Sequence, residues 1–162
     1  MAGRTDVRTT LATYLTNGNI YGVNQVYTSF PKIENLNTGA IAGQASFAGL
    51  VVFIMDEKDS RIAVGGAASG WKRVDYTVSV QILHQSYERE AEAAMAHFDL
   101  VVESLKERLR ADRQFGDATG NLVWQGANPS MFATYAEPEI ADLGVIKTWC
   151  ALQFPVTQMI QA

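Results

Sequence analysis

The sequence predicts an α+β domain in which a mostly antiparallel or mixed sheet is packed by one long helix and a short N-terminal helix. Residues 88–111 carry apolar side chains at three- and four-residue spacing, as a helix with one buried face does. Residues 71–83 and 144–157 alternate apolar and polar side chains, as half-buried strands do. Strands grouped on either side of one long helix favour the α+β class with a largely antiparallel sheet.

The composition fits a single domain with a sizeable core. The chain has 162 residues, of which 48% are apolar and 19% charged, so we expect one ordered domain over 1–162. The net charge of −4 argues against a protein that coats nucleic acid through phosphate contacts. A single cysteine allows no internal disulfide, and the sequence has no apolar stretch of about eighteen residues that would span a membrane.

The chain begins with a short predicted helix. Apolar side chains recur on one helical face over 7–15, and Thr5 or Asp6 stands where a side chain can cap the first turn. The Asn-Gly-Asn triplet at 17–19 ends the helix, because both residue types tolerate the left-handed conformation. A strand over 23–28 follows, with alternate side chains on opposite faces.

An irregular arm at about 29–49 interrupts this pattern. A proline and three glycines punctuate it, yet it keeps apolar groups that a pure linker would lack. A stretch of this length inside a compact domain is usually functional or mobile. We therefore interpret it as an arm that packs on another surface, which can belong to another chain. Its apolar residues are Phe30, Ile33, Leu36, Ile41 and Phe47.

Three segments with β character precede the long helix. The apolar run 50–55 predicts a buried strand, 56–60 a charged turn, and 61–64 the returning partner strand. A glycine-rich bend at 65–70 then leads into the strand 71–83, which has the clearest alternation in the chain.

The long helix is predicted over about 88–111. Its start is acidic and its end is basic, an order that complements the helix dipole. A short strand at 122–124 follows, then a second irregular stretch at 127–143 and the final strand 144–157. Cys150 falls on the apolar face of that final strand, so we expect a small buried thiol rather than a nucleophile.

The sequence contains no recognisable set of catalytic or ligand-binding residues. The bend at 65–73 is the nearest to a phosphate loop, but Trp71 stands where that motif needs lysine, and a strand follows instead of a helix. His84 and His97, the only histidines, are interpreted as isolated surface or core side chains without metal-ligand or catalytic spacing. We predict no enzyme activity, no cofactor and no metal site.

Several segments together resemble the tail terminator proteins of long-tailed, non-contractile phages, especially those that infect actinobacteria. The resemblance begins with Gly70-Trp71-Lys72-Arg73-Val74-Asp75-Tyr76-Thr77-Val78-Ser79-Val80 and continues through His84, Ser86 and 91–113. Ala94-Met95, Phe98-Asp99 and 105–112 are the most similar parts of the helix, and Leu122-Val123-Trp124-Gln125 and the closing strand are also similar. These segments cover more than half of the chain. The arm at 29–49 is not matched.

The resemblance implies a structural virion protein that forms a ring, typically a hexamer, at the head-proximal end of the tail tube. Such a ring stops tube polymerisation and offers a joining surface to the head. The implied partners are other copies of the chain, the tail tube protein, and the head-tail connector or head-completion protein. The resemblance also implies assembly in the host cytoplasm, a final location in the virion tail, and no membrane.

The two irregular stretches are the candidate contact surfaces of such a ring. A ring needs two different complementary patches on each subunit, and the stretches at 29–49 and 127–143 both carry apolar side chains. Ordinary loop packing on the subunit's own sheet is the alternative. The candidate interface residues are Phe30, Ile33, Leu36, Ile41, Phe47, Met131, Phe132 and Tyr135.

The acidic charge is concentrated in the second half of the chain. Residues 86–162 sum to −5, whereas residues 1–85 sum to +1. Six copies at −4 each would carry about −24, and an acidic lumen would let DNA pass without specific binding. Glu137, Glu139 and Asp142 are the candidate lumen residues; a solvated acidic face is the alternative.

Two other functions remain open at this point. The chain can be another neck or tail component, such as a head-completion protein or a tail-tube subunit, and a tube subunit would polymerise without limit. A small cytosolic ligand-binding domain is the more distant alternative. It would require a deep polar pocket with converging titratable groups.

Overall fold

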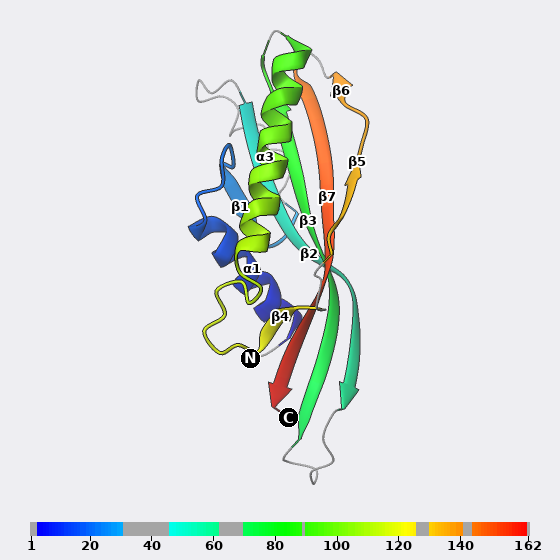
Figure 1. Ribbon diagram of the computed structural model, residues 1–162. Helices are drawn as coiled ribbons and strands as arrows, with labels where there is room; N and C mark the ends of the chain where they lie inside the picture. Colours follow the sequence, from blue (N-terminus) through cyan, green and yellow to red (C-terminus); the bar gives the residue numbers. More distant parts are fainter. Residues whose placement is uncertain are drawn as a thin grey trace.

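The structure, a computed structural model, describes residues 3–30, 46–61, 70–88, 90–125, 130–140 and 144–161. It contains two helices and seven strands within those ranges. The long helix α3 lies along one face of a twisted sheet, and the shorter helix α1 lies beside the lower half of that face (Figure 1). The predicted α+β class with a mostly antiparallel sheet is confirmed.

The sheet is built around three strands of sixteen residues each. The strand order is β1-β2-β3-β7-β4, and β5 and β6 also pair with β7. Only the β1–β2 pair is parallel; the other pairs are antiparallel. The strands are β1 (Gln25–Tyr27), β2 (Ser46–Arg61), β3 (Trp71–Ser86), β4 (Leu122–Trp124), β5 (Phe132–Tyr135), β6 (Glu139–Ile140) and β7 (Ile146–Gln161).

Helix α1 spans Arg4–Asn17 and begins earlier than predicted. Gly3 occupies the N-cap position and no side chain caps the helix, so the expected cap by Thr5 or Asp6 is wrong. Both residues lie inside the first turn, where Asp6 still complements the helix dipole. The predicted apolar face is confirmed, because Val7, Leu11 and Leu15 are buried in the core.

Strand β2 is much longer than the apolar run that predicted it. It starts at Ser46, inside the expected arm, and continues through the charged residues 56–60, which were expected to form a turn. It pairs with nearly all of β3, from Ser46 opposite Ser86 to Arg61 opposite Lys72. A register shift between Ile54 and Asp56 marks the point where the apolar half gives way to the charged half.

Helix α3 spans Ala91–Ala111 and starts three residues later than predicted. Strand β3 runs on to Ser86, whose hydroxyl accepts a hydrogen bond from the backbone N–H of Glu88 at 3.2 Å. The chain is thus still leaving the strand where the helix was expected, and Glu90 takes the N-cap position. The predicted buried stripe is confirmed for Ala94, Phe98, Val101, Val102, Leu105 and Leu109.

The core lies between the sheet and the two helices. Its sheet face comes from alternate residues of β3 and β7, so the predicted period-two patterns of both strands are confirmed. An aromatic group closes its lower end, where the indole ring of Trp124 lies 5.0 Å from the Phe154 ring and 6.0 Å from the Phe115 ring between centroids. This group fixes β4 and the loop after α3 against the sheet.

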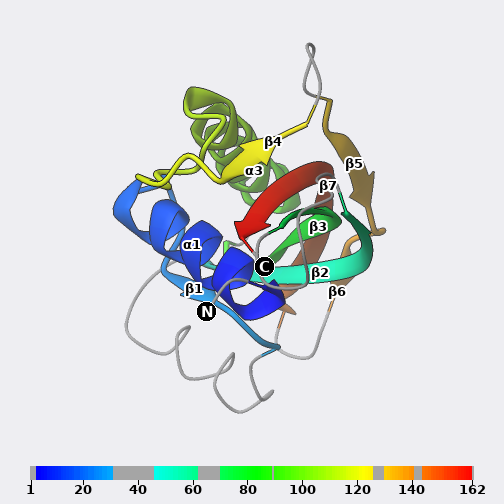
Figure 2. The same cartoon turned by 90° about the horizontal axis from the view of Figure 1, so that it is seen from below.

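The stretch at 127–143, predicted to be irregular, contains two short strands in its described part. Residues 132–135 form β5 opposite β7 residues 150–153, and residues 139–140 form β6 opposite 146–147. The view from below places β5 and β6 on one side of the molecule and α1 and β1 on the other (Figure 2). The two sides of the sheet are therefore formed by different elements.

Candidate assembly surfaces

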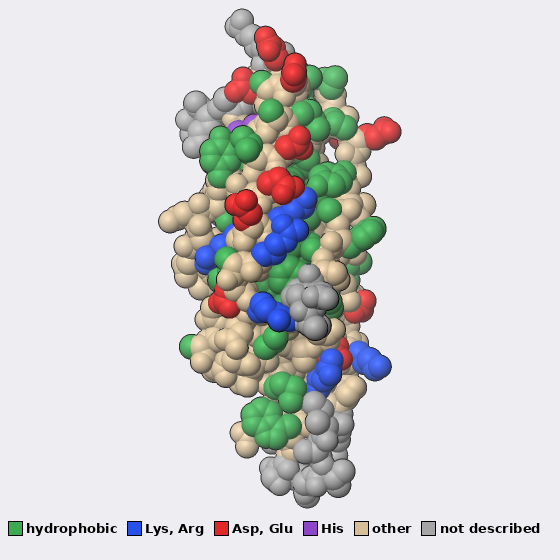
Figure 3. All heavy atoms as spheres, in the orientation of Figure 1, with side chains coloured by type: hydrophobic (Ala, Val, Ile, Leu, Met, Phe, Trp, Pro, Cys, Tyr) green, Lys and Arg blue, Asp and Glu red, His purple; other side chains and the backbone are tan. Residues whose placement is uncertain are grey.

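The edge formed by β5 and β6 carries three exposed apolar side chains, two of which are the most exposed large apolar side chains of the described residues. Phe132 is 68% exposed, Tyr135 51% and Ile140 77%. The space-filling view shows hydrophobic side chains gathered along this edge, next to the charged face of α3 (Figure 3). Phe132 pairs with Gln153 on the outer face of the sheet, whereas Tyr135 and Ile140 pair with Cys150 and Ile146 on the helix face, so this edge exposes apolar side chains on both of its faces. Exposed apolar groups that gather in this way mark contact sites more often than isolated ones do. This edge is the first candidate assembly surface.

The β1 side of the sheet carries a second pair of exposed aromatic residues. Tyr21 is 55% exposed and its ring stacks obliquely on His97 with 5.6 Å between centroids. Phe30 is 58% exposed and makes an edge-on contact with Phe53 of β2 at 5.8 Å. Each ring contacts one ring of its own chain, and more than half of each side chain remains exposed to solvent.

The structure places the predicted interface residues in different environments. Phe30, Phe132 and Tyr135 are exposed, and Met131 is half-buried against the core. Phe47 is only 3% exposed within β2, so its side chain is already covered. Three further candidates (Ile33, Leu36 and Ile41) lie outside the described residues.

Two of the three predicted lumen acids can be located. Glu137 and Glu139 are exposed: Glu137 lies between β5 and β6, and Glu139 is the first residue of β6. Neither forms an ion pair within the described part of the chain. Asp142 lies outside the described residues. Their role in a lumen stays a prediction.

The two long free edges of the sheet differ in charge. Below β1, the edge of β2 carries the charged run 56–59, and Arg4 of α1 donates to the Ile54 carbonyl at 3.4 Å and pairs with Glu57. Charges of this kind protect an edge strand against pairing with another chain. Residues 130–136 on the opposite side contain no charged side chain. The β5 strand, like the short strands β1 and β4, lacks this protection.

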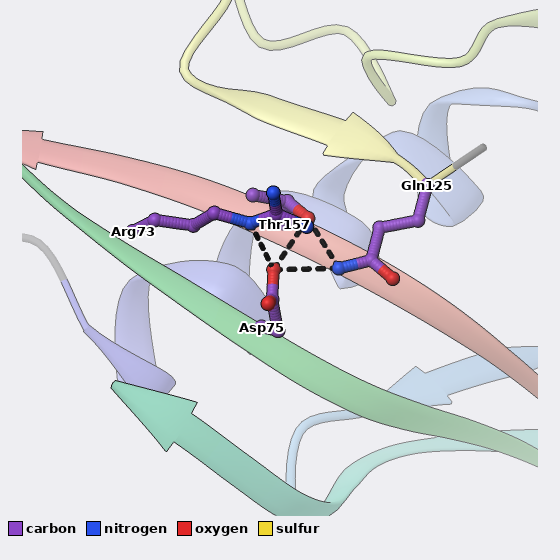
Figure 4. Close-up of polar contacts among 4 residues, drawn as sticks. All are labelled: Arg73, Asp75, Gln125 and Thr157. Atoms are coloured by element: carbon purple, nitrogen blue, oxygen red, sulfur yellow. Dashed lines mark hydrogen bonds and ion pairs between the residues drawn. The ribbon is translucent and has the colours of Figure 1, made fainter. Parts of the chain in front are cut away.

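A polar cluster on the outer face of the sheet joins β4 to the long strands (Figure 4). One carboxylate oxygen of Asp75 accepts hydrogen bonds from Arg73 at 2.7 Å, Gln125 at 2.5 Å and Thr157 at 2.8 Å. Although burial opposes the effect, these hydrogen bonds and the Arg73 charge hold the pKa of Asp75 below its usual value. Each polar group is engaged by its own chain, which indicates a structural role.

The buried His84 contacts the half-buried His97, so the expectation that the two histidines are isolated is wrong. His84 Nε2 and His97 Nδ1 are 2.9 Å apart, and the chain of contacts extends to Thr148 Oγ1 at 3.1 Å and Ser46 Oγ at 3.3 Å. It thereby links α3 to three strands. The expectation of a core histidine is confirmed for His84, which is 1% exposed.

Burial is the main cause that lowers the pKa of His84 to about 4, and the charge of His97 is the second. Folding therefore favours the neutral imidazole, and the unfolded chain binds more protons between about pH 4 and pH 6.5. No spacing along the sequence reveals this pair, because one member ends a strand and the other lies on the helix that follows.

We expect the free energy of unfolding to fall by about 3 kcal/mol as the pH drops from 6.5 to about 4, because of His84 alone. His84→Gln keeps a hydrogen-bonding side chain without this titration. Urea unfolding of both proteins at steps between pH 7.5 and pH 4 measures the effect. Carboxylates also titrate in this range, so the difference between the two curves is the measure, and parallel curves would refute the assignment.

Cys150 is fully buried, as predicted. Burial raises the pKa of its thiol to about 11, against the opposing influence of Lys106 and a hydrogen bond with Tyr135. The thiol is therefore protonated at neutral pH. Tyr135 reaches it from β5 and also packs edge-on against Phe98 with 6.4 Å between centroids. These contacts anchor the β5 strand to the core.

A groove of about 610 Å³ lies between α1 and the end of α3. Arg108 lies over the Tyr14 ring at 3.7 Å and donates to the Tyr14 carbonyl at 3.0 Å. The carboxylate of Asp112 accepts from the backbone N–H groups of Gln114 and Gly116. The charged groups of this groove are engaged by the chain's own atoms and do not converge on a common point, as a ligand site requires.

No group of three or more metal-ligating side chains lies together in the described ranges. Among the described helices, none has the length and apolar character needed to cross a membrane.

No known protein family and no curated protein matches the chain. Among solved structures it is similar to the sheath/tube terminator of an extracellular contractile injection system (PVC, extended state), with 11% identity and a TM-score of 0.39. That similarity covers all of this chain and 57% of the other, so the chain spans a little over half the length of that protein. It is also similar to a chain of the virion of a native gene transfer agent particle, with 12% identity, a TM-score of 0.25, and coverage of 91% and 84%. Both likenesses are remote.

Proposed function

We propose that this chain is a structural virion protein that forms a ring at the head-proximal end of a phage tail tube. The ring, which we take to be a hexamer, stops tube polymerisation and presents the joining surface for the head connector. The sequence resemblance to tail terminators of long-tailed, non-contractile phages supports this role. The observation in the structure that supports it most is the uncharged β5 edge with its exposed Phe132, because an edge strand without charges can pair with another chain.

The polar groups described above form hydrogen bonds within the chain, which also favours a binding role over catalysis. The carboxylate of Asp75 and the charged groups of the α1–α3 groove are used by the chain itself. The buried thiol of Cys150 is held protonated, since its pKa is raised to about 11. We therefore assign the function to the exposed apolar surfaces of the sheet.

The charge fits a ring through which DNA passes. Six copies would carry about −24, and this field repels the phosphate backbone of DNA. We propose that the partners are other copies of the chain, the tail tube protein and the head connector, in the virion tail.

Electron microscopy of the purified protein, alone and mixed with tube subunits, tests the proposal. We expect closed rings of one size, and tubes that carry a ring at one end and stop growing. Open-ended polymers of the protein itself would instead indicate a tube subunit, the second candidate. A protein that stays monomeric in both samples would contradict the proposed function.

A further inference from the structure

The two exposed aromatic surfaces lie on opposite sides of one sheet and at matching levels. Here the level of a residue means its position along the strands, which can be followed through the residue pairs from one strand to the next. Phe53, which contacts Phe30, pairs with Ser79 of β3, and Ser79 pairs with Gln153 of β7. Gln153 in turn pairs with Phe132 of β5. Phe30 and Phe132 therefore end the same row of the sheet, one on each side.

A second row repeats this arrangement nearer the start of α3. Tyr21 stacks on His97, whose Nε2 lies 3.3 Å from the hydroxyl of Ser46 in β2. Ser46 pairs with Ser86, Ser86 with Ile146, and Ile146 with the exposed Ile140 of β6. Ile140 therefore lies nearer the start of α3 than Phe132 does, and Tyr21 lies toward the same end on the other side, because its partner His97 contacts both Ser46 and His84.

The β5 side also offers a hollow for a side chain. A cavity of about 340 Å³ lies beside Phe132 and is lined by Met131, Phe154 and Pro155 together with Thr77, Ser130 and Gln153. It lies at the level of the row that ends in Phe30. Aromatic anchors that fill such hollows carry much of the binding energy at protein interfaces.

We propose that a second copy of this chain docks on the β5–β6 edge with its Tyr21–Phe30 surface, so that Phe30 enters the hollow beside Phe132. The occupant follows from symmetry. A ring closes by rotation without rise, so its two different contact surfaces lie at one level along the ring axis. Phe30 and Phe132, which end the same row of the sheet, meet this condition for an axis along the strands. The ring axis then runs along the direction of β3 and β7. This inference rests on the proposed function and assigns the residues of the seam between copies.

The charges agree with this assignment. The free edge of β2 carries the charged run 56–59, which protects it against strand pairing. Residues 130–136 are uncharged, as the centre of an interface usually is. Glu137 and Glu139 then lie at the rim of the seam.

Two single substitutions, one on each side, test the seam. Phe30→Asp and Phe132→Asp place a charge at the centre of the proposed contact, and both residues are more than half exposed. We expect each to weaken the junction about 30-fold or more and to yield monomers by native mass spectrometry. Leu100→Asp, at a 55% exposed position of α3 outside both surfaces, is the matched control and should keep the wild-type rings.

A mixture of the two variants is the sharper measurement. Each keeps one intact surface, so the mixture should contain dimers with one copy of each variant and no larger rings. Wild-type rings from either variant alone, or full rings from the mixture, would overturn the seam and leave the proposed function intact. A wild-type protein that forms no ring, alone or with tube subunits, overturns both. Thermal unfolding of each variant checks that the fold is kept, and Phe30→Ser replaces Phe30→Asp if that variant unfolds.

Discussion

A phage in which this gene is interrupted is expected to make tails of uncontrolled length that do not join heads. The proposed ring covers the growing end of the tube, and without it tube subunits keep adding. The same ring presents the surface that the head recognises, so heads and tails should accumulate separately. Electron micrographs of lysates, with tail lengths measured on many particles, give the readout.

Complementation makes this prediction specific to the proposed surfaces. A plasmid that supplies the wild-type chain should restore tails of one length with heads attached, and so should Leu100→Asp. Phe132→Asp should not restore them, because its β5 edge no longer binds the next copy. Normal, head-attached tails in the interrupted phage would contradict the proposed function.

Trp124→Ala is expected to cost about 3–5 kcal/mol of unfolding free energy. The indole ring is 1% exposed and packs between the rings of Phe115 and Phe154. Its removal leaves a cavity that the neighbouring rings cannot fill, since the strand β4 that carries it is held at both ends. At the start of β4 the backbone N–H of Leu122 donates to the Asp117 carboxylate. At its end the backbone N–H of Trp124 donates to the Arg113 carbonyl, and the Gln125 side chain donates to Asp75. Urea denaturation gives the difference directly.

Trp71→Ala is the matched control, because it deletes the same side chain at a position that is 42% exposed. We expect it to cost about 1 kcal/mol or less. Trp124→Phe should fall between the two, because it keeps a ring and removes an indole N–H that has no partner among the described residues. Equal losses for Trp124→Ala and Trp71→Ala would show that the aromatic group does not hold the core together.

The periodic elements were predictable because each buries one face. The helix stripe that includes Phe98 and Leu105, and the alternation in β3 and β7, arise from local spacing that any fold must satisfy. The same reasoning underestimated β2, since its charged half resembles a turn and becomes a strand only through pairing with the first half of β3. The β5 and β6 strands were missed for the same reason: their partner, β7, supplies the order.

Local pattern determined the class of fold, the face of each long element that is buried and the buried state of Cys150. Tertiary structure decided which distant residues meet: the His84–His97 contact, the three donors around Asp75, and the rows that bring Phe30 and Phe132 to one level. Burial periodicity is a property of neighbouring residues, whereas these contacts depend on strand register across four chain segments. Register is set by the packing of the whole sheet, so no single segment encodes it.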